Sequence, residues 1–358
     1  MNNNIKSRIQ HLDGLRGVAI LVVLLHHAYS RWGELIEGQK DTFLSNLFTQ
    51  GSLGVQLFFM ISGFVIVMSL KKTENFFYFL YKRWLRLFPA MFVFSLIAFL
   101  LKDLFLDRPA GIINFVDLLP GLTFIEPAFY NKIFQLNVPV KSLDGVFWSL
   151  YAEVKFYIFI SFFYFFLKDK KCFSVICAYA LFVLFKFLDF DHPLIVNCLI
   201  YSGFAYFGFF SLGILAYHCF FEKNIEYKNL YKYSYIGLAL IVLLHSQFRT
   251  PNIIELLNII IIIFVFYTSF NNIFINIFLT NNFLIFFGFI SYPLYLIHQY
   301  IVADLTIKIN SLFDSYSFLF PILPMLCVIF IAFIIAKYFE KNLRNFILNI
   351  QRRISQKY

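Results

Sequence analysis

The segment Arg16-Gly-Val-Ala-Ile-Leu-Val-Val-Leu-Leu-His26-His27 is almost entirely apolar, yet it carries ionisable side chains at both ends. Eleven residues of α-helix advance roughly 16 Å and about three turns, so Arg16 and His27 return to nearly the same face. Ionisable groups are costly in lipid, and those within a membrane span usually face the protein interior and mark a functional path. The segment therefore predicts a membrane-spanning helix with a functional face. The alternative is a polar pair that only lines a packed interface.

The rest of the chain has the same apolar character. Of its 358 residues, 60% are hydrophobic and 14% are charged, whereas a soluble domain is roughly 45–50% apolar. We expect an all-α integral membrane protein, a polytopic bundle of about ten transmembrane helices. Residues 1–340 would form this membrane domain, and residues 341–358 a short basic cytosolic tail. The predicted spans lie near residues 15–31, 53–70, 88–102, 146–167, 172–188, 198–220, 232–247, 253–270, 283–303 and 317–336.

Two connections between the predicted spans stand out. Residues 71–87 are expected to form a cytosolic turn that ends at Pro89, where a new helix can begin. Residues 103–145 form a long outer connection that is rich in proline. Loops of this length usually carry local structure or function, so its apolar piece from Ile112 to Ile125 is expected to be an interfacial or re-entrant segment. The alternative is a plain tether.

Charge indicates how the chain is oriented. The net charge is +10, with 30 Lys and Arg against 20 Asp and Glu. With a cytosolic N-terminus, most basic residues fall in the inner connections, as the positive-inside rule requires, and an even number of spans places the C-terminus in the cytosol as well. The charge thus reflects topology and contact with anionic lipid headgroups rather than nucleic-acid binding. We expect a multi-pass protein of the cytoplasmic membrane.

Three titratable side chains reach a similar outer depth from three different predicted helices, namely His27, Glu153 and His298. An imidazole beside a carboxylate is the usual equipment for taking a proton from a hydroxyl. The carboxylate can also orient the ring, as in a His–Asp pair. These three residues are therefore the catalytic candidates. The structural alternatives are that Glu153 pairs with an Arg or Lys, and that His298 is a packed, hydrogen-bonded histidine.

Three arginines gather toward the cytosolic side, namely Arg16, Arg83 and Arg86. Guanidinium groups capture phosphates through paired hydrogen bonds, so this end is expected to bind a phosphorylated donor made in the cytosol. The alternative for Arg83 and Arg86 is simple positive-inside anchoring. No metal is expected, because the five cysteines show neither metal-ligand spacing nor a disulfide framework.

Taken together and in order, several of these segments resemble the membrane acyltransferase-3 family, whose members O-acetylate surface polysaccharides and other extracytoplasmic acceptors. Each motif alone is weak, but the ordered set is specific and covers about residues 10–300. The motifs are His11–Gly17, His27-Ala28, Phe58–Phe64, Arg83–Pro89, Trp148–Glu153 and Ile290–His298.

The resemblance implies an acyl-CoA donor, usually acetyl-CoA. It implies that Arg16 and His27 correspond to the family's characteristic arginine and histidine on the first helix. By the same matching, Arg83 and Arg86 would assist donor binding, and Glu153 would belong to the catalytic region. The chain departs from the family after its Trp-Ser-Leu motif, where two acidic residues and Gln are common. It has Glu153-Val154-Lys155 instead, which places more weight on Glu153.

The sequence thus predicts a membrane O-acyltransferase that moves an acetyl group from cytosolic acetyl-CoA to a hydroxyl of an extracytoplasmic carbohydrate or glycolipid, such as a surface polysaccharide. His27 would act as general base, oriented by Glu153. The expected partners are the lipid bilayer, the glycan acceptor and acyl-CoA, with no nucleic acid. One alternative is a proton-coupled transporter of a lipid-linked sugar or acidic solute that uses the same His and Glu as a relay. A non-catalytic partner in envelope assembly is a weaker one.

Overall fold

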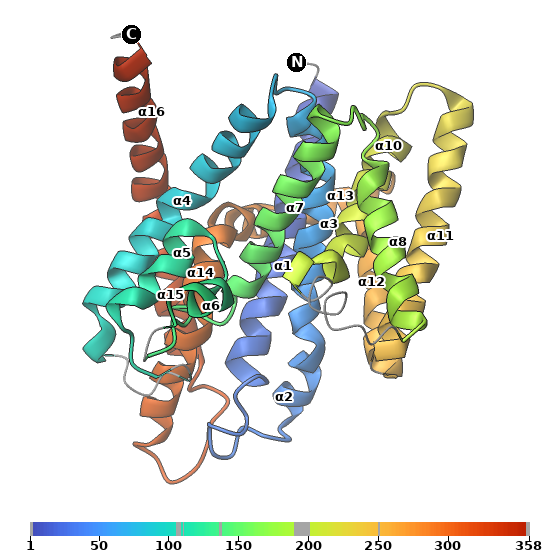
Figure 1. Cartoon of the computed structure of the whole chain (residues 1–358). Coiled ribbons are helices and arrows are strands. Elements are labelled where there is room, and N and C mark those ends of the chain that lie inside the picture. The colour runs from blue at the N-terminus through green and yellow to red at the C-terminus, as the bar shows by residue number, and fades with distance from the viewer. Residues whose placement is uncertain are drawn as a thin grey trace. The chain divides into compact units, whose positions relative to one another are not determined.

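The computed structural model describes residues 3–104, 109, 111–135, 138–189, 201–249 and 251–355, and within these ranges it contains helices and no strand (Figure 1). A π-helical segment, Ile335–Glu340, joins the last two α-helices, and short 3-10 turns cover Thr49–Leu53, Lys102–Leu104, Phe115–Asp117 and Phe204–Tyr206. The all-helical class is as predicted. The α-helices are α1 (Asn3–Tyr29), α2 (Phe43–Phe48), α3 (Gly54–Leu70), α4 (Phe76–Leu100), α5 (Leu118–Thr123), α6 (Pro127–Phe134), α7 (Phe147–Phe165), α8 (Phe173–Phe187), α10 (Phe207–Phe221), α11 (Ile225–Arg249), α12 (Ile253–Thr268), α13 (Ile273–Leu279), α14 (Asn282–Asn310), α15 (Ile322–Ile334) and α16 (Lys341–Ser355).

Six of the described helical stretches are long and apolar enough to cross a membrane, which makes this a multi-pass membrane protein. The pair α12 and α13 meets at 98° and adds a seventh crossing if it is one broken span. The other predicted spans coincide with α7, α8 and α11, where α7 includes Glu153 and Lys155 and α8 is short. The start of the predicted span 198–220 lies outside the described residues. A total of ten therefore stays a prediction. The six stretches are Gln10–Tyr29, Phe43–Leu70, Phe76–Leu100, Phe204–Phe221, Asn282–Asn310 and Ile322–Arg353.

The predicted turn over residues 71–87 is wrong in its length. The helix α4 already begins at Phe76 and runs to Leu100 with Pro89 inside it. A proline removes one backbone hydrogen bond, but membrane helices tolerate it because neighbouring groups satisfy the freed backbone. Close to this point, Tyr292 of α14 donates a hydrogen bond to the carbonyl of Leu87 at 2.8 Å. The aromatic residues before Pro89 therefore belong to the helix, and Arg83 and Arg86 lie within α4.

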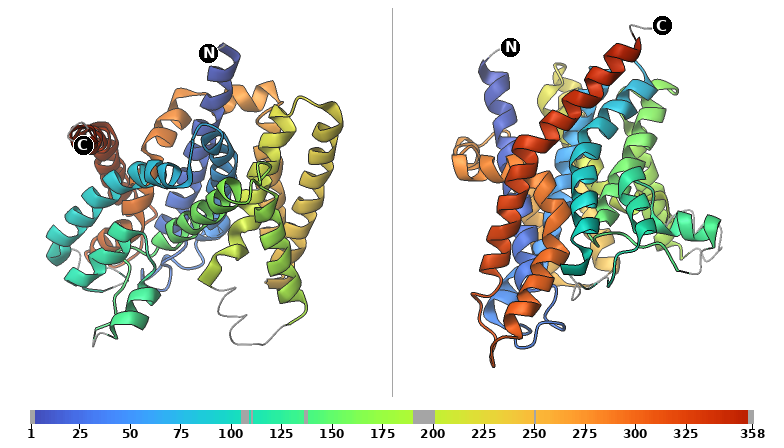
Figure 2. Two further views of the ribbon diagram at one scale, coloured as in Figure 1. Left: turned by 45° about the horizontal axis from the view of Figure 1, so that its top comes forward. Right: turned by 90° about the vertical axis from the view of Figure 1, so that its left-hand side faces the viewer.

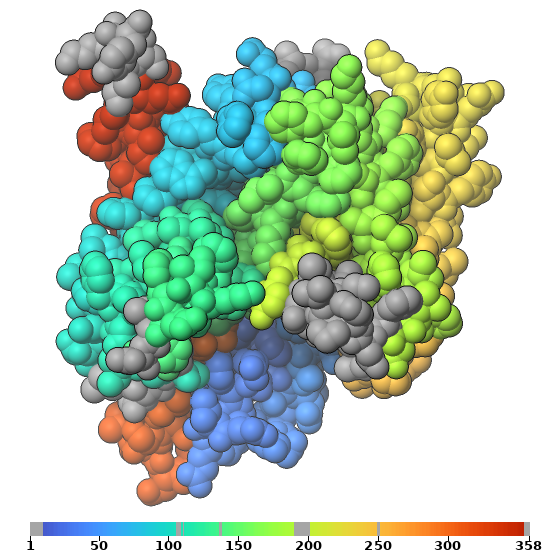
Figure 3. All heavy atoms as spheres, viewed as in Figure 1, coloured from blue at the N-terminus to red at the C-terminus, as the bar shows by residue number. Residues whose placement is uncertain are grey.

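The described chain forms two compact units, and each is described by itself. The first contains Met1–Ala19, Leu53–Tyr81 and Ala152–Gly288. In it α10 packs against α3, α8 and α11, and α12 contacts both α3 and α11 (Figure 1). Exposed apolar side chains cover α8 and α11, part of whose surface is seen in Figure 3, as expected for helices that face lipid: Leu181, Leu184, Tyr233, Ile236, Leu240 and Leu244.

Glycines allow a close helix contact in this unit, between α3 and α10. A Cβ added to Gly63 of α3 would lie 2.0 Å from the carbonyl oxygen of Phe210. A Cβ added to Gly213 of α10 would lie 2.0 Å from the carbonyl oxygen of Met60. Small residues at such crossings let two membrane helices approach backbone to backbone. Beside this contact the rings of Phe59 and Phe210 stack with centroids 4.6 Å apart.

The second unit contains Ile20–Ser52, Lys82–Tyr151 and Phe289–Tyr358. A small apolar core forms around Trp32, Ile36 and Ala303. The helix α15 passes through the π-helical segment into α16, and Figure 2 shows this part as one long helical rod. Along α16 lie the basic residues Lys341, Arg344, Arg352 and Arg353 and the exposed apolar side chains of Phe346 and Ile350.

The long outer connection is locally ordered where it is described. It contains two short helices: α5 lies within the apolar piece from Ile112 to Ile125, and α6 follows that piece. The side chain of Asp117, 2% exposed, accepts hydrogen bonds from the backbone N–H groups of Asn114 at 2.8 Å and Lys141 at 2.7 Å. One buried carboxylate thereby joins the two ends of this connection.

Candidate active site

Two imidazoles meet in the second unit. His27, near the end of α1, and His298, on α14, approach each other with 3.1 Å between Nδ1 of His27 and Nε2 of His298. Both are buried, with 9% and 0% of their surfaces exposed. Their ring centroids lie 4.8 Å apart in an edge-on arrangement. The two residues are 271 positions apart in sequence, so only the packing of their helices brings them together.

Backbone carbonyls fix the orientation of both rings. Nδ1 of His27 lies 2.9 Å from the carbonyl oxygen of Val23. Nδ1 of His298 lies 3.1 Å and 3.0 Å from the carbonyl oxygens of Leu294 and Tyr295. A carbonyl oxygen only accepts, so each Nδ1 carries a hydrogen and donates it. In neutral His27 the lone pair then lies on Nε2, which is the basic atom of the ring.

The turn of α14 that carries His298 is held by the segment around the start of α7. The hydroxyl of Tyr295 lies 2.7 Å from the hydroxyl of Ser149. Asp144, 1% exposed, accepts a hydrogen bond from the backbone N–H of Tyr300 at 3.2 Å. These contacts lie two and three residues from His298 on the same helix, so the backbone that carries its ring is held in place on both sides.

Glu153 belongs to the first unit, on α7, where two hydroxyls bind its carboxylate. Ser62 of α3 donates to Oε1 at 2.6 Å, and Tyr157, one turn later on α7, donates to the same oxygen. Hydrogen bonds from hydroxyls to a carboxylate are short and strong. The described contacts of Glu153 are thus with hydroxyls rather than with the Arg or Lys of the structural alternative.

Arg16, also in the first unit, forms an ion pair with Asp13. Their Nη1 and Oδ1 atoms lie 2.8 Å apart, and 20% of the Arg16 side chain is exposed. The two residues are three apart on α1, a spacing that places them on one helix face. The guanidinium is therefore mostly covered and held by a carboxylate one turn away.

Arg83 and Arg86 lie on α4 in the second unit. Both are partly exposed, and the Nε and Nη1 atoms of Arg83 are buried. Arg86 interacts electrostatically with Glu340 of the π-helical segment, as does Arg344. The burial of the Arg83 nitrogens shows that its guanidinium does not simply extend into lipid or water.

The structure therefore brings one pair of candidates into contact, His27 and His298. Within the same unit it places Arg83 and Arg86 on α4, while Arg16 and Glu153 belong to the other unit. The pairing of an imidazole with a carboxylate, which the sequence favours, stays a prediction. The observed neighbour of the His27 ring is a second imidazole.

Sequence reasoning missed several side chains that hold the candidates. Ser62 could have been found, because it lies inside the Phe58–Phe64 motif. Tyr157 follows Glu153 by four residues, a spacing at which helical side chains meet. Tyr295 likewise lies inside the Ile290–His298 motif. Asp144 gives no comparable signal, since its contact depends on how the outer connection packs.

A third imidazole lies beside the pair. The ring of His26 is 5.0 Å from that of His27, and its Nδ1 lies 2.9 Å from the carbonyl oxygen of Phe48. Among the described residues, no group of three or more His, Cys, Asp or Glu is arranged to hold a metal ion.

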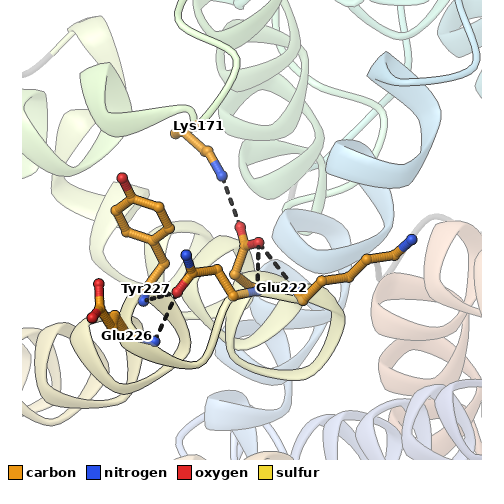
Figure 4. Close-up of polar contacts among 6 residues, drawn as sticks. Lys171, Glu222, Glu226 and Tyr227 are labelled. Carbon is orange, nitrogen blue, oxygen red and sulfur yellow. Dashed lines mark hydrogen bonds and ion pairs between the residues drawn. The ribbon is translucent and has the colours of Figure 1, made fainter.

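A separate ion pair in the first unit joins the segment just before α8 to the end of α10. Lys171 donates to Glu222 at 2.8 Å, and the backbone N–H groups of Lys223 and Asn224 donate to the other carboxylate oxygen (Figure 4). The Lys171 ammonium is the main reason that the pKa of Glu222 falls from its ordinary value to about 2. In turn, Glu222 raises the pKa of Lys171. This pair fixes the connection that leads into α11.

With the geometry in view, the comparison with known proteins decides the family. A family described as "Acyltransferase domain" matches residues 9–340, nearly the whole chain. The chain belongs to the acyltransferase-3 family. The match includes α4, α7, α14 and α1 from residue 9 onward, and these four helices carry all six candidate residues.

Relatives of this acyltransferase-3 chain are named for O-acetyl transfer. One is the O-acetyl transferase of Shigella phage Sf6, 34% identical over 89 residues, which are 25% of this chain and 25% of the phage protein. Another, from Staphylococcus aureus strain COL, is provisionally named an O-acetyltransferase and is 29% identical over 167 residues, 42% of this chain and 24% of that protein. The matched regions thus span about a quarter of the relatives' lengths. No solved structure gave a significant match.

Proposed function

We propose that this protein is an O-acetyltransferase of the cytoplasmic membrane. It transfers an acetyl group from cytosolic acetyl-CoA to a hydroxyl of an extracytoplasmic carbohydrate or glycolipid. The family supports acyl transfer, and the names of the phage and staphylococcal relatives support an acetyl group and an oxygen acceptor. The observation that carries the proposal is the buried imidazole of His27, held so that Nε2 is its basic atom.

His27 acts as the general base. The acceptor oxygen attacks the carbonyl carbon of the thioester, and its proton moves to Nε2 of His27 as the new C–O bond forms. The C–S bond then breaks, and the thiolate of coenzyme A leaves and receives that proton. A positioned base of this kind contributes about 10²–10⁴-fold to the rate.

The three arginines bind the phosphates of the donor. A planar guanidinium forms two parallel hydrogen bonds to a phosphate, which fixes both position and direction. Asp13 holds Arg16, and the charge of Glu340 acts on Arg86. These carboxylates keep the guanidinium groups in place until the more highly charged donor arrives.

Glu153 completes the set of catalytic candidates. Its carboxylate is fixed by Ser62 and Tyr157, which leaves the charge oriented rather than mobile. A fixed negative charge costs no reorganisation when positive charge develops during the reaction. We assign Glu153 the role of stabilising the positive charge that develops during the reaction.

Deletion of the gene, followed by complementation, tests the proposal. The O-acetyl content of each surface glycan is measured by mass spectrometry and proton resonance. The control is His245→Ala, at a histidine of α11 in the first unit whose Nδ1 lies 3.1 Å from the hydroxyl of Tyr179. We expect the wild type and this control to restore the acetyl groups lost on deletion. We expect His27→Ala to restore none at equal abundance in the membrane. Full acetylation by His27→Ala would remove the base assignment, and transport of an intact glycan without acetyl-CoA would indicate the transporter instead.

A further inference from the structure

The hydrogen-bonding groups of the two imidazoles form a directed chain. The carbonyl oxygens of Leu294 and Tyr295 require a hydrogen on Nδ1 of His298. A neutral imidazole with a hydrogen on Nδ1 accepts at Nε2, and this atom lies 3.1 Å from Nδ1 of His27. That second Nδ1 carries a hydrogen as well, because it also faces the carbonyl oxygen of Val23 at 2.9 Å. One N–H of His27 is therefore shared between a carbonyl and the lone pair of His298.

We infer that His298 is a positioning residue that accepts the Nδ1 hydrogen of His27 and thereby lets the two rings share the proton taken from the acceptor. This inference rests on the proposed function and names the partner of its base. His298 fills the place that a carboxylate has in a His–Asp pair.

The proton balance closes over both steps. When the acceptor hydroxyl gives its proton to Nε2 of His27, the Nδ1 hydrogen of His27 moves toward Nε2 of His298. His298 then carries hydrogens on both nitrogens, and its Nδ1–H remains bonded to the two carbonyl oxygens. When the thiolate leaves, His27 gives up its Nε2 proton and recovers the Nδ1 hydrogen from His298. Both rings return to their starting tautomers.

Burial explains why a second imidazole suits this position. His298 is fully buried, and a permanent negative charge there would carry a large desolvation cost. A neutral imidazole avoids that cost at rest and still accepts a hydrogen bond. When His298 becomes positive, the oxygens of Leu294 and Tyr295 already point at its Nδ1–H, so no further reorganisation is needed.

The backbone around His298 is built to hold this geometry. Tyr295 is fixed by Ser149, and the N–H of Tyr300 is bound by Asp144. His26, the other imidazole beside His27, has its Nδ1 engaged by the carbonyl of Phe48. Of the two neighbouring rings, His298 is thus the one whose nitrogen meets Nδ1 of His27.

Two substitutions at one position test the inference. The purified full chain is reconstituted in lipid vesicles and assayed with acetyl-CoA and the glycan fraction identified by gene deletion. We expect His298→Leu to lower kcat about 100-fold, because the base loses its partner, with both KM values within about twofold of the wild type. We expect His298→Gln, whose amide oxygen accepts a hydrogen bond but takes no proton, to recover part of this loss.

Single-turnover rates in mixtures of H2O and D2O give a second, independent readout. Two hydrogens move in the wild type, so the rate is expected to curve with the deuterium fraction. In His298→Gln only one hydrogen moves, and the dependence becomes linear. A wild-type kcat in His298→Leu, or an unchanged curve and rate in His298→Gln, would overturn the inference. If His298→Leu does not fold, the Gln variant decides alone. If the wild-type protein itself transfers no acetyl group in this assay, the proposed function is contradicted instead.

Discussion

At Glu153 the charge of one carboxylate is held by two hydroxyls, and each can be removed without altering the backbone. Hydrogen bonds to a charged group contribute about 1.5–3 kcal/mol. We expect Ser62→Ala and Tyr157→Phe each to lower acetyl transfer about tenfold, and the double variant to lower it further. Rates measured at equal membrane abundance check this, and the coupling follows from the double-mutant cycle. Tyr233→Phe, at a residue of α11 that is 73% exposed, is predicted to keep the wild-type rate.

A rate equal to the wild type in both single variants and in the double variant would mean that Glu153 needs neither donor. In that case any electrostatic role of the Glu153 carboxylate would not depend on the hydrogen bonds that hold it in place.

The Lys171–Glu222 pair gives a prediction for the dependence of stability on pH. The pKa of Glu222 is lowered from 4.5 to about 2, so the pair stabilises the fold fully above the ordinary carboxylate pKa and loses this effect as the pH falls toward 2. We expect Glu222→Gln to melt slightly below the wild type at pH 7 and to approach it below pH 4. Thermal unfolding in detergent at several pH values checks this. The group is close to solvent, so high salt is also expected to reduce the difference.

Among elements, the contact of α3 with α10 is sensitive to added volume on both helices. A Cβ at Gly213 would meet the Met60 carbonyl oxygen at 2.0 Å and the Phe64 nitrogen at 2.8 Å, and neither backbone atom can move alone. We expect Gly213→Ala to destabilise the protein by about 1–3 kcal/mol through overpacking. Gly237 of α11 is the matched control, because an added Cβ there meets nothing within 4 Å. Gly237→Ala is expected to be neutral or slightly stabilising.

Melting temperature and yield of the folded protein in detergent measure both glycine variants. Equal melting temperatures and yields of the two variants would show that α3 and α10 can move apart without loss of stability. That result would contradict the prediction drawn from the close approach of their backbones.

Most elements could be predicted from the sequence, because apolar length alone marks a membrane helix. Arg16 and His27 lie within one helix, α1, as their shared apolar segment predicted. Pro89 is an exception, since a residue that usually begins a helix in soluble proteins lies inside α4. The apolar piece from Ile112 to Ile125 contains the short helix α5, which follows directly on Asp117 and its hydrogen bonds to Asn114 and Lys141.

For the whole molecule, the sequence selected His27 and His298 separately but could not pair them. Their contact joins positions 271 residues apart and arises from tertiary packing. The sequence favoured a carboxylate as the partner of the base, since that is the common chemistry of such sites. The second imidazole could be recognised only once Leu294 and Tyr295 showed which of its nitrogens carries the hydrogen.

The topology of the whole chain rests on how many times it crosses the bilayer. Six spans, or ten, return the C-terminus to the side of the N-terminus, whereas a single crossing by α12 and α13 makes seven and separates them. The basic residues Arg344, Arg352 and Arg353 of α16 favour a cytosolic C-terminus. We expect a fluorescent protein fused after Tyr358 to fluoresce and alkaline phosphatase at the same place to be inactive. Phosphatase fused after Leu312, before α15, should be active, because one span has been removed. The reverse pattern at both fusions would show that the orientation is opposite to the predicted one. Arg83 and Arg86 could then no longer be assigned to a cytosolic donor.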